Sequence, residues 1–180
     1  ARQEGQGMST KTKELTAALA DYRRPHLGKS LWQLFNSSAL LVITWALMYA
    51  SLDVSYWLTL LLAVPAAFFM IRLFIIQHDC GHGSFFRSSR VADAVGRVIG
   101  VLSLTPYTYW RRTHAIHHAT SGNLEHRGFG DIDTRTIAEY MALSRWGRLK
   151  YRLFRHPLVL FGGGAAFHFV VRHRLPFIVP

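Results

Sequence analysis

Residues 34–76 read LFNSSALLVITWALMYASLDVSYWLTLLLAVPAAFFMIRLFII and decide the fold class. The first half, 34–52, is interrupted only by small polar residues and one asparagine, and the second half, 54–76, carries one charge, Arg72. A hydrocarbon core about 30 Å thick needs roughly 20 apolar residues in a helix, so each half is long enough to cross it. The short connection between the halves predicts an antiparallel transmembrane hairpin. A buried helical hairpin of a soluble protein is the alternative.

The composition of the whole chain favours a membrane protein. Of the 180 residues, 50% are hydrophobic and only 17% are charged, whereas about a quarter of a typical soluble domain is charged. The single cysteine excludes an internal disulfide framework. The formal net charge of +11 suits nucleic acid, anionic lipid or an acidic protein partner. Ten histidines are an unusually high number for this length, so their placement matters most.

We expect an all-α integral membrane protein with four successive segments. Residues 1–33 are polar and basic and form a cytoplasmic N-terminal segment, with a short amphipathic helix before Pro25. The hairpin follows. Residues 77–156 form a cytoplasmic helical segment, in which 91–106 are too short and too charged to span and are expected to lie in the membrane interface. Residues 157–180 are apolar at both ends and predict the start of a third membrane segment, cut short at Pro180.

Basic residues are distributed unevenly around the hairpin, and this distribution predicts its orientation. The turn between the spans has no lysine or arginine, while residues 77–156 carry twelve. Six more precede the first span: Arg2, Lys11, Lys13, Arg23, Arg24 and Lys29. Positive charge stays on the cytoplasmic side of a membrane, so both flanking segments should be cytoplasmic. Arg72 can extend its side chain to the same face.

Two histidine clusters follow the hairpin, within one segment. His78 and His82 are separated by four positions, so on a helix they lie on one face, about 40° apart. His114, His117 and His118 span about 100° of a helix and can point toward one volume. Together the two clusters are much stronger evidence of a metal site than either cluster alone, since five imidazoles could meet just outside the bilayer. Imidazole ligands suit iron, zinc or copper.

Each cluster also has a simpler explanation. The first could be a pair of structural histidines, and the second, beside Arg111 and Arg112, could contact nucleic acid or lipid headgroups. Neither cluster has the glutamate of a zinc hydrolase of the His-Glu-x-x-His type. Asp79 could orient a ligand through the second ring nitrogen of a histidine, or it could be a plain solvated acid.

These residues resemble a known family, the membrane fatty acid desaturases, and within it most of all the bacterial acyl-lipid type. The matching stretches are HDCGHGSFF at 78–86, WRRTHAIHHATSGN at 110–123, GFGDIDT at 128–134 and RHPLVLFG at 155–162. The resemblance implies a non-haem di-iron centre whose histidines come from three boxes. The first box corresponds to His78 and His82, and the second to His114, His117 and His118.

The third box of the family has no counterpart in this chain. His156, His168 and His173 do not have its His-x-x-His-His spacing. We therefore expect an N-terminal fragment of a longer enzyme and expect that the 180-residue chain by itself is inactive. No catalytic residue beyond the metal ligands and no organic cofactor are expected.

The resemblance also implies the reaction and the partners. Two iron ions, dioxygen and two electrons would introduce a cis double bond into the acyl chain of an acyl-lipid or acyl-thioester substrate. Tyr107, Tyr109 and Trp110 could line the route of the acyl chain or belong to an interfacial aromatic belt. The basic surface suits an acidic electron donor such as a ferredoxin, and equally suits membrane lipid. The expected location is the bacterial inner membrane, with the boxes facing the cytoplasm.

Three other functions remain open. A hydroxylase of the same histidine-box superfamily would insert oxygen instead of removing hydrogen. A non-enzymatic membrane metal-binding or transport protein would need polar ligands within its spans, and only Arg72 and His168 are available there. A bis-histidine haem protein would carry single histidines on facing spans. Nucleic acid is the poorest partner, because it leaves the hairpin unexplained.

Overall fold

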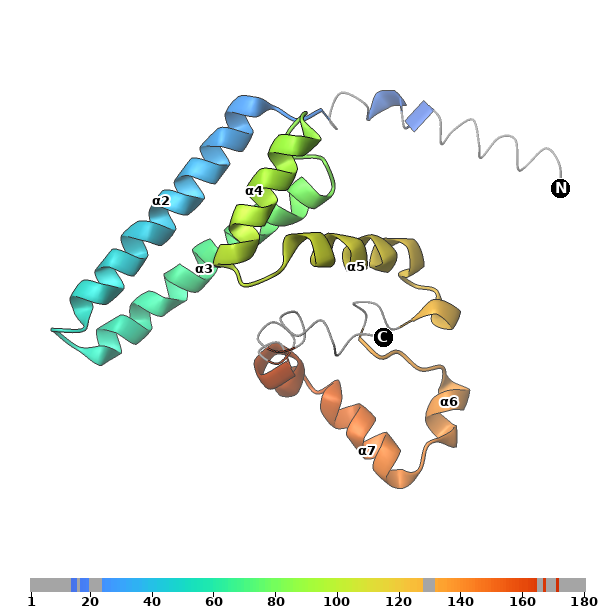
Figure 1. The fold of residues 1–180 in the computed structure, drawn as a ribbon. Helices are drawn as coiled ribbons and strands as arrows, with labels where there is room; N and C mark the ends of the chain where they lie inside the picture. The colour runs from blue at the N-terminus through green and yellow to red at the C-terminus, as the bar shows by residue number, and fades with distance from the viewer. Residues whose placement is uncertain are drawn as a thin grey trace. The chain divides into compact units, whose positions relative to one another are not determined.

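A computed structural model describes residues 24–127 and 132–164, together with 14–15, 17–19, 167 and 171. It divides into two compact units, residues 1–99 and 100–180, with the division inside one helix. The described residues form helices, turns and loops without a strand, so the expected all-α class is confirmed (Figure 1). Two of the helices are long and apolar enough to cross a membrane.

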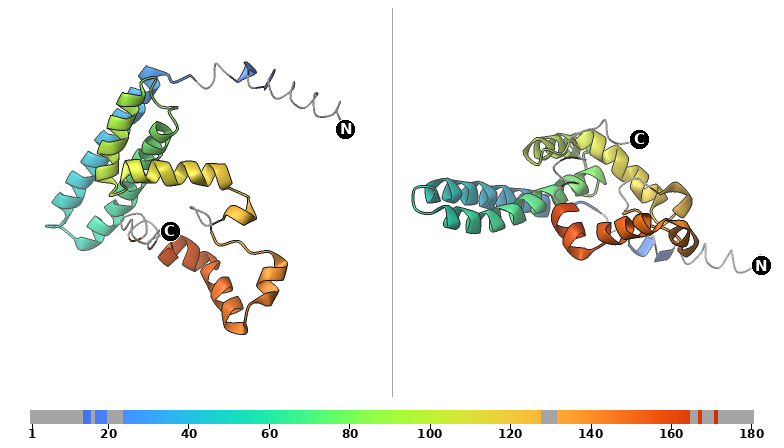
Figure 2. Two further views of the ribbon diagram at one scale, coloured as in Figure 1. Left: turned by 45° about the vertical axis from the view of Figure 1, so that its right-hand side comes forward. Right: turned by 90° about the horizontal axis from the view of Figure 1, so that it is seen from below.

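The first unit is built on a long helical hairpin. Helix α2 runs over Leu27–Ser51 and helix α3 over Tyr56–Gly81, and the two lie antiparallel side by side (Figures 1 and 2). At 1.5 Å per residue each helix is nearly 40 Å long, which exceeds a hydrocarbon core of about 30 Å. Most of their large apolar side chains are exposed, as expected for surfaces that face lipid. Pro65 lies inside α3 without ending it.

The seam between the two helices follows a seven-residue repeat. On α2 the buried positions include Ser30, Ser37, Thr44 and Ser51, and on α3 they include Thr59, Ala66, Leu73 and Cys80. Positions seven apart stay on one side of a helix that supercoils gently with its partner. Small side chains let helix backbones approach closely inside a membrane, where apolar burial alone drives no association.

Polar contacts join α2 to α3 at two levels. Near the turn, the hydroxyl oxygens of Ser51 and Thr59 are 2.7 Å apart and both side chains are buried. In the half nearer the histidines, Arg72 donates from Nη2 to Oδ1 of Asn36 at 3.1 Å. The one charge within residues 54–76 and the one amide within residues 34–52 are therefore partners, which satisfies two groups that lipid could not solvate.

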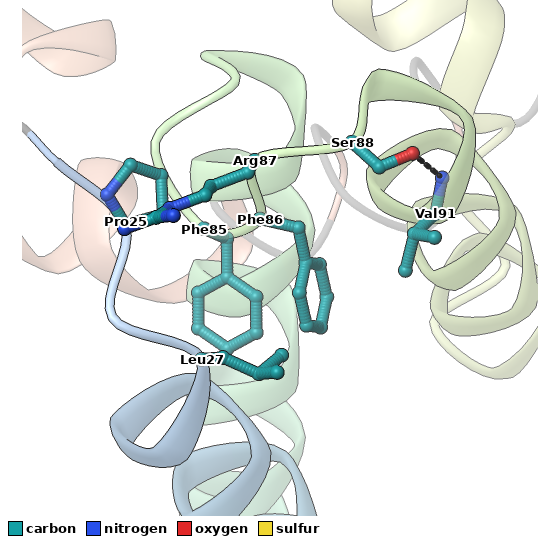
Figure 3. Close-up of a pocket in the computed structure, with 7 residues that line it drawn as sticks. All are labelled: Pro25, Leu27, Phe85, Phe86, Arg87, Ser88 and Val91. Atoms are coloured by element: carbon teal, nitrogen blue, oxygen red, sulfur yellow. Dashed lines mark hydrogen bonds between the residues drawn. The ribbon is translucent and has the colours of Figure 1, made fainter.

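The loop after α3 is fixed against the start of α2. Ser30 donates its hydroxyl proton to the carbonyl oxygen of Phe85 at 2.6 Å. The rings of Phe85 and Phe86 are buried and meet edge to face, with Phe85 above Leu27 (Figure 3). Leu27, Phe85 and Phe86 help to line a cavity of about 200 Å³. Helix α4, Ser89–Leu102, begins after this loop.

A tight turn leads from α4 into α5, Tyr107–Thr120. The amide of Thr105 donates to the carbonyl of Gly100 at 2.8 Å, and the amide of Leu104 donates to Val101 at 3.2 Å. This is a Schellman motif with Leu104 in the left-handed region, at φ 53°. A Cβ on Gly100 would lie 2.7 Å from the Thr105 carbonyl oxygen, so the turn requires glycine there.

The remainder of the second unit consists of short helices with polar caps. They are the 3₁₀-helix η1, Leu124–His126; α6, Ile137–Ala142; α7, Arg145–Phe154; and the π-helix η2, Val159–Gly164. Thr136 and Glu139 form a reciprocal capping box at the start of α6, and Ser144 caps α7. Arg127 holds the Glu139 carboxylate through two bonds, of 2.5 and 3.0 Å.

The helix boundaries differ from the expected ones at several ends. Helix α2 begins at Leu27 because His26 caps it, accepting from the Lys29 amide, so it includes polar residues that hydropathy alone assigns to the preceding segment. Helix α4 ends at Leu102 instead of residue 106, because the turn that follows it intervenes. Of the amphipathic helix expected before Pro25, only residues 14–15 and 17–19 are described. In the third apolar stretch, the structure describes helix only as far as residue 164, with 167 and 171 beyond it.

Candidate metal centre

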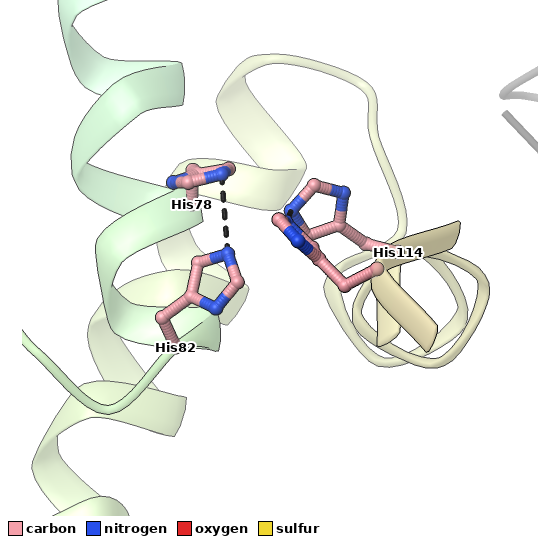
Figure 4. Close-up of side chains that lie close together, drawn as sticks. His78, His82 and His114 are labelled. Carbon is pink, nitrogen blue, oxygen red and sulfur yellow. Dashed lines mark hydrogen bonds between the residues drawn. The ribbon is translucent and has the colours of Figure 1, made fainter. Parts of the chain in front are cut away.

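The first histidine box lies at the end of α3. His78 is in its last turn and His82 caps it, and their Nε2 atoms are 3.2 Å apart (Figure 4). Helix α3 ends at Gly81, so His82 is its C-cap. Gly83 takes φ 69° and donates to the Cys80 carbonyl, while the Ser84 amide donates to Asp79 at 3.0 Å. Glycine supplies the left-handed residue that this Schellman motif requires, so His82 stays beside His78.

Asp79 orients the first of these imidazoles. Its Oδ1 is 3.1 Å from Nδ1 of His78, and both side chains are partly exposed. A carboxylate that accepts from Nδ1–H leaves Nε2 with a free lone pair, which is the tautomer that a metal ligand needs. Of the two interpretations of Asp79 from sequence, the geometry favours an orienting role over a plain solvated acid.

The second box lies on α5. His114 and His118 are one turn apart, and their Nε2 atoms are 3.0 Å from each other. His117 is on the same helix, with its ring centroid 5.9 Å from that of His114 and 5.7 Å from that of His118. The i, i+4 pair therefore shares a small volume, while the third imidazole of the box is set to one side.

An aromatic side chain supports the second box. The indole of Trp110 is buried and stacks on the His114 ring, with centroids 4.6 Å apart and planes inclined by 16°. Tyr107 is buried as well. Burial of both side chains contradicts an exposed aromatic belt. The stacking gives Trp110 a role that was not predicted from the sequence: it restricts the rotation of a box histidine.

The donor atoms of each pair fit one metal ion. Nitrogens bound at about 2.1 Å, the length of a zinc–imidazole bond, and 3.0–3.2 Å apart would subtend an angle of about 90–100° at the ion. This is a normal angle between neighbouring ligands in octahedral coordination. His78, His82, His114 and His118 thus have the chemistry and, within each pair, the spacing of metal ligands.

The other histidines contribute nothing to these pairs. His126 lies at the end of η1, with its Nδ1 3.3 Å from the amide nitrogen of Asn123. His156 accepts from the Leu158 amide through Nδ1, as a cap at the start of the next helical segment. His168 and His173 lie outside the described residues.

Comparison with known proteins agrees with these features. A profile of the fatty acid desaturase family matches residues 55–179. The chain is 47% identical over 169 residues to a fatty acid desaturase of Bacillus subtilis, which covers 94% of this chain and 48% of the relative. The chain belongs to the fatty acid desaturase family. No solved structure matches it.

Other relatives carry more specific names. An sn-1 acyl-lipid omega-3 desaturase (ferredoxin) of Synechocystis is 32% identical over 123 residues, 64% of this chain and 34% of the relative. An omega-3 fatty acid desaturase of the endoplasmic reticulum of Vigna radiata is 41% identical over 86 residues, 47% of this chain and 22% of the relative. The chain spans about half the length, or less, of these relatives.

Proposed function

We propose that the protein carrying this chain is a fatty acid desaturase that introduces a cis double bond into an acyl chain, and that both histidine boxes contribute to one di-iron centre. The observation that carries the proposal is the spacing within the boxes, Nε2 to Nε2, of 3.2 Å for His78 and His82 and 3.0 Å for His114 and His118. Membership of the desaturase family supports it.

The chain's own residues hold and orient the metal ligands. Asp79 holds Nδ1 of His78, whose Nε2 lies 3.2 Å from that of His82, and Trp110 holds the ring of His114 by stacking. His117 completes the second box from the same helix. Bound iron would supply the reduction of dioxygen to two waters, with two electrons from the donor, two protons, and two hydrogens from neighbouring methylenes.

The substrate and the electron donor follow from the relatives and the charge of the chain. Relatives named acyl-lipid desaturases support an acyl chain on a membrane lipid, and the same names include ferredoxin. Ferredoxins are acidic, and a chain with a formal net charge of +11 is complementary to such a donor. We propose no nucleic acid partner, because nucleic acid would leave the hairpin unexplained.

The proposed location is the bacterial inner membrane, with the N-terminal segment and both boxes in the cytoplasm. The support is the distribution of basic residues, six before the hairpin and twelve after it, with none in its turn. Cysteine variants Asp53→Cys and Ser88→Cys test it with an impermeant thiol reagent in intact cells. We expect labelling only at position 53, because position 88 would face the cytoplasm. The native Cys80 is buried and should give little background labelling. Labelling of both positions from the outside would exclude this topology.

Product analysis tests the activity. The longer protein, expressed in a host with saturated and monounsaturated lipids, should yield new double bonds, and His117→Ala should abolish them. The matched control is His126→Ala, which removes an exposed histidine outside both boxes. Hydroxylated acyl chains instead of new double bonds would favour the hydroxylase. Unchanged product in the His117 variant would remove His117 from the ligand set.

The 180-residue chain serves as a further arm of that experiment. Five box histidines shared by two irons leave fewer than three protein ligands each, and controlled oxygen chemistry requires a tightly held set of ligands. We therefore expect no double bonds from residues 1–180 alone, even with iron, dioxygen and a reducing system. Turnover with two irons per chain would show that these five histidines suffice.

A further inference from the structure

Helix α7 has one face that is fastened within its own unit. The hydroxyl of Tyr151 accepts from the Arg135 amide at 3.3 Å, and Arg155 donates from Nη1 to the Asp133 carbonyl at 2.9 Å. The guanidinium carbons of Arg135 and Arg155 lie 6.0 and 5.5 Å from the centre of the Tyr151 ring, and the Tyr140 ring contacts it too. The face of α7 that carries Tyr151 is thus held against residues 133–140.

The opposite face of α7 is an exposed apolar stripe. Trp146, Leu149 and Leu153 follow one another at helical spacing and lie within about 60° of each other around the axis. They are 74%, 40% and 53% exposed. By the same arithmetic Tyr151 is about 170° away from the middle of the stripe. An ordered stripe of this kind, held outward by the packing of the other face, marks an interaction surface.

Basic side chains flank the stripe on both sides. Lys150 lies about 65° from its middle on one side and Arg145 about 75° on the other, with Arg152 next to Arg145. All three are exposed. The two acids of residues 132–156 are already engaged, Asp133 with Arg135 and Glu139 with Arg127. The positive charge beside the stripe is therefore not neutralised by those acids.

We propose that α7 docks on the surface of an anionic phospholipid bilayer, with Trp146, Leu149 and Leu153 at the boundary of the acyl chains and Arg145, Lys150 and Arg152 on lipid phosphates. A narrow apolar stripe with cations on both sides is complementary to that boundary, and a tryptophan prefers the same depth. Two more large apolar side chains are exposed in the segment that follows α7, Leu158 and Phe161, at 79% each. The inference goes beyond the proposed desaturase activity and does not depend on a metal.

Depth-resolved quenching tests the docking. Leu149→Cys and Arg148→Cys carry a fluorescent label at neighbouring positions about 100° apart on the helix, and the native chain, whose Cys80 is buried, gives the background. The labelled full chain is reconstituted into vesicles of phosphatidylcholine with phosphatidylglycerol. We expect a quencher attached to the acyl chains to act several-fold more strongly at 149 than at 148, and aqueous iodide to act in the reverse order. Equal quenching at both positions would overturn the proposal.

Charge variants test the choice of an anionic surface. Lys150→Glu should reduce acyl-chain quenching of the label at 149 several-fold in vesicles that contain phosphatidylglycerol. Arg148→Glu changes the net charge equally but on the face away from the stripe, so it should have a smaller effect. Equal effects of the two variants, or quenching that is indifferent to phosphatidylglycerol, would refute the role of lipid phosphates. A label at 149 that is quenched only by iodide would leave a soluble partner as the occupant.

Discussion

Single side chains beside the box histidines define much of the proposed metal site. Asp79 contacts Nδ1 of His78, Trp110 restrains the ring of His114, and Gly83 ends α3 directly after His82. None of the three is a proposed ligand, yet each one restricts where an imidazole nitrogen of a histidine box can lie. Positioning of this kind governs metal affinity, because ligands that are already in place lose less conformational freedom when the ion binds.

Glu139 makes a residue-scale prediction about acid. The bidentate bond from Arg127, together with the Thr136 amide and hydroxyl, lowers the pKa of Glu139 from 4.5 to about 2. The folded pKa lies below the unfolded value, so this contact stabilises fully above about pH 4.5 and is lost as the pH falls toward 2. Carboxyl NMR should give a midpoint near 2 for Glu139. A midpoint near its ordinary value would mean that the pair does not form.

A variant pair separates this contact from the general effect of acid. Glu139→Gln should flatten the loss of thermal stability between pH 4.5 and 2, because the neutral amide has no proton to gain. Glu125→Gln removes an exposed carboxylate of the same unit and should leave the loss almost unchanged. Identical pH profiles for the two variants would show that protonation of Glu139 does not cause the loss of stability in acid.

At the scale of elements, the hairpin depends on the heptad seam. Small residues on α2 face Thr59, Ala66, Leu73 and Cys80 of α3, so the helices approach closely. Ala66→Phe should force them apart and lower the thermal stability of the protein in detergent, by about 1–3 kcal/mol if overpacking here costs what it does in soluble cores. Ala67→Phe adds the same ring at an exposed position and should cost much less. Equal losses of thermal stability in the two variants would show that Ala66 does not lie in a tighter seam than Ala67.

The sequence predicts the hairpin and the two boxes because each depends on local periodicity. Length and hydropathy identify the spans, and i, i+4 spacing alone brings His78 near His82 and His114 near His118. The seam was missed, because small polar residues such as Ser37 and Thr44 resemble interruptions in an apolar run. Their repeat every seven residues is the pattern from which the seam could be predicted.

Contacts between distant residues could not be predicted in the same way. The bond of Arg72 to Asn36 joins positions 36 residues apart, and its geometry depends on how the two helices pack.

The stacking of Trp110 on His114 is local, but the aromatic character of Trp110 suits a belt, a substrate channel or a ring contact equally well. The spacing that produces the contact, i and i+4, was the clue.

For the whole molecule, the central proposal is that both histidine boxes supply ligands to one metal centre. The hairpin fixes the first box at the end of α3, and the turn at Gly100 leads into the helix that carries the second. The first box alone offers two nitrogens and the second three, too few for a firmly held pair of irons. Loss of one histidine from either box should therefore lower the metal content of the protein as a whole.

The iron content of the purified longer protein measures this most directly. His82→Ala and His118→Ala, one variant in each box, should each bind clearly less iron than the native protein while keeping the same circular dichroism spectrum. His126→Ala, which removes a histidine outside both boxes, should retain the native content. Native iron content in a protein that carries both His82→Ala and His118→Ala would contradict a metal centre built from these boxes.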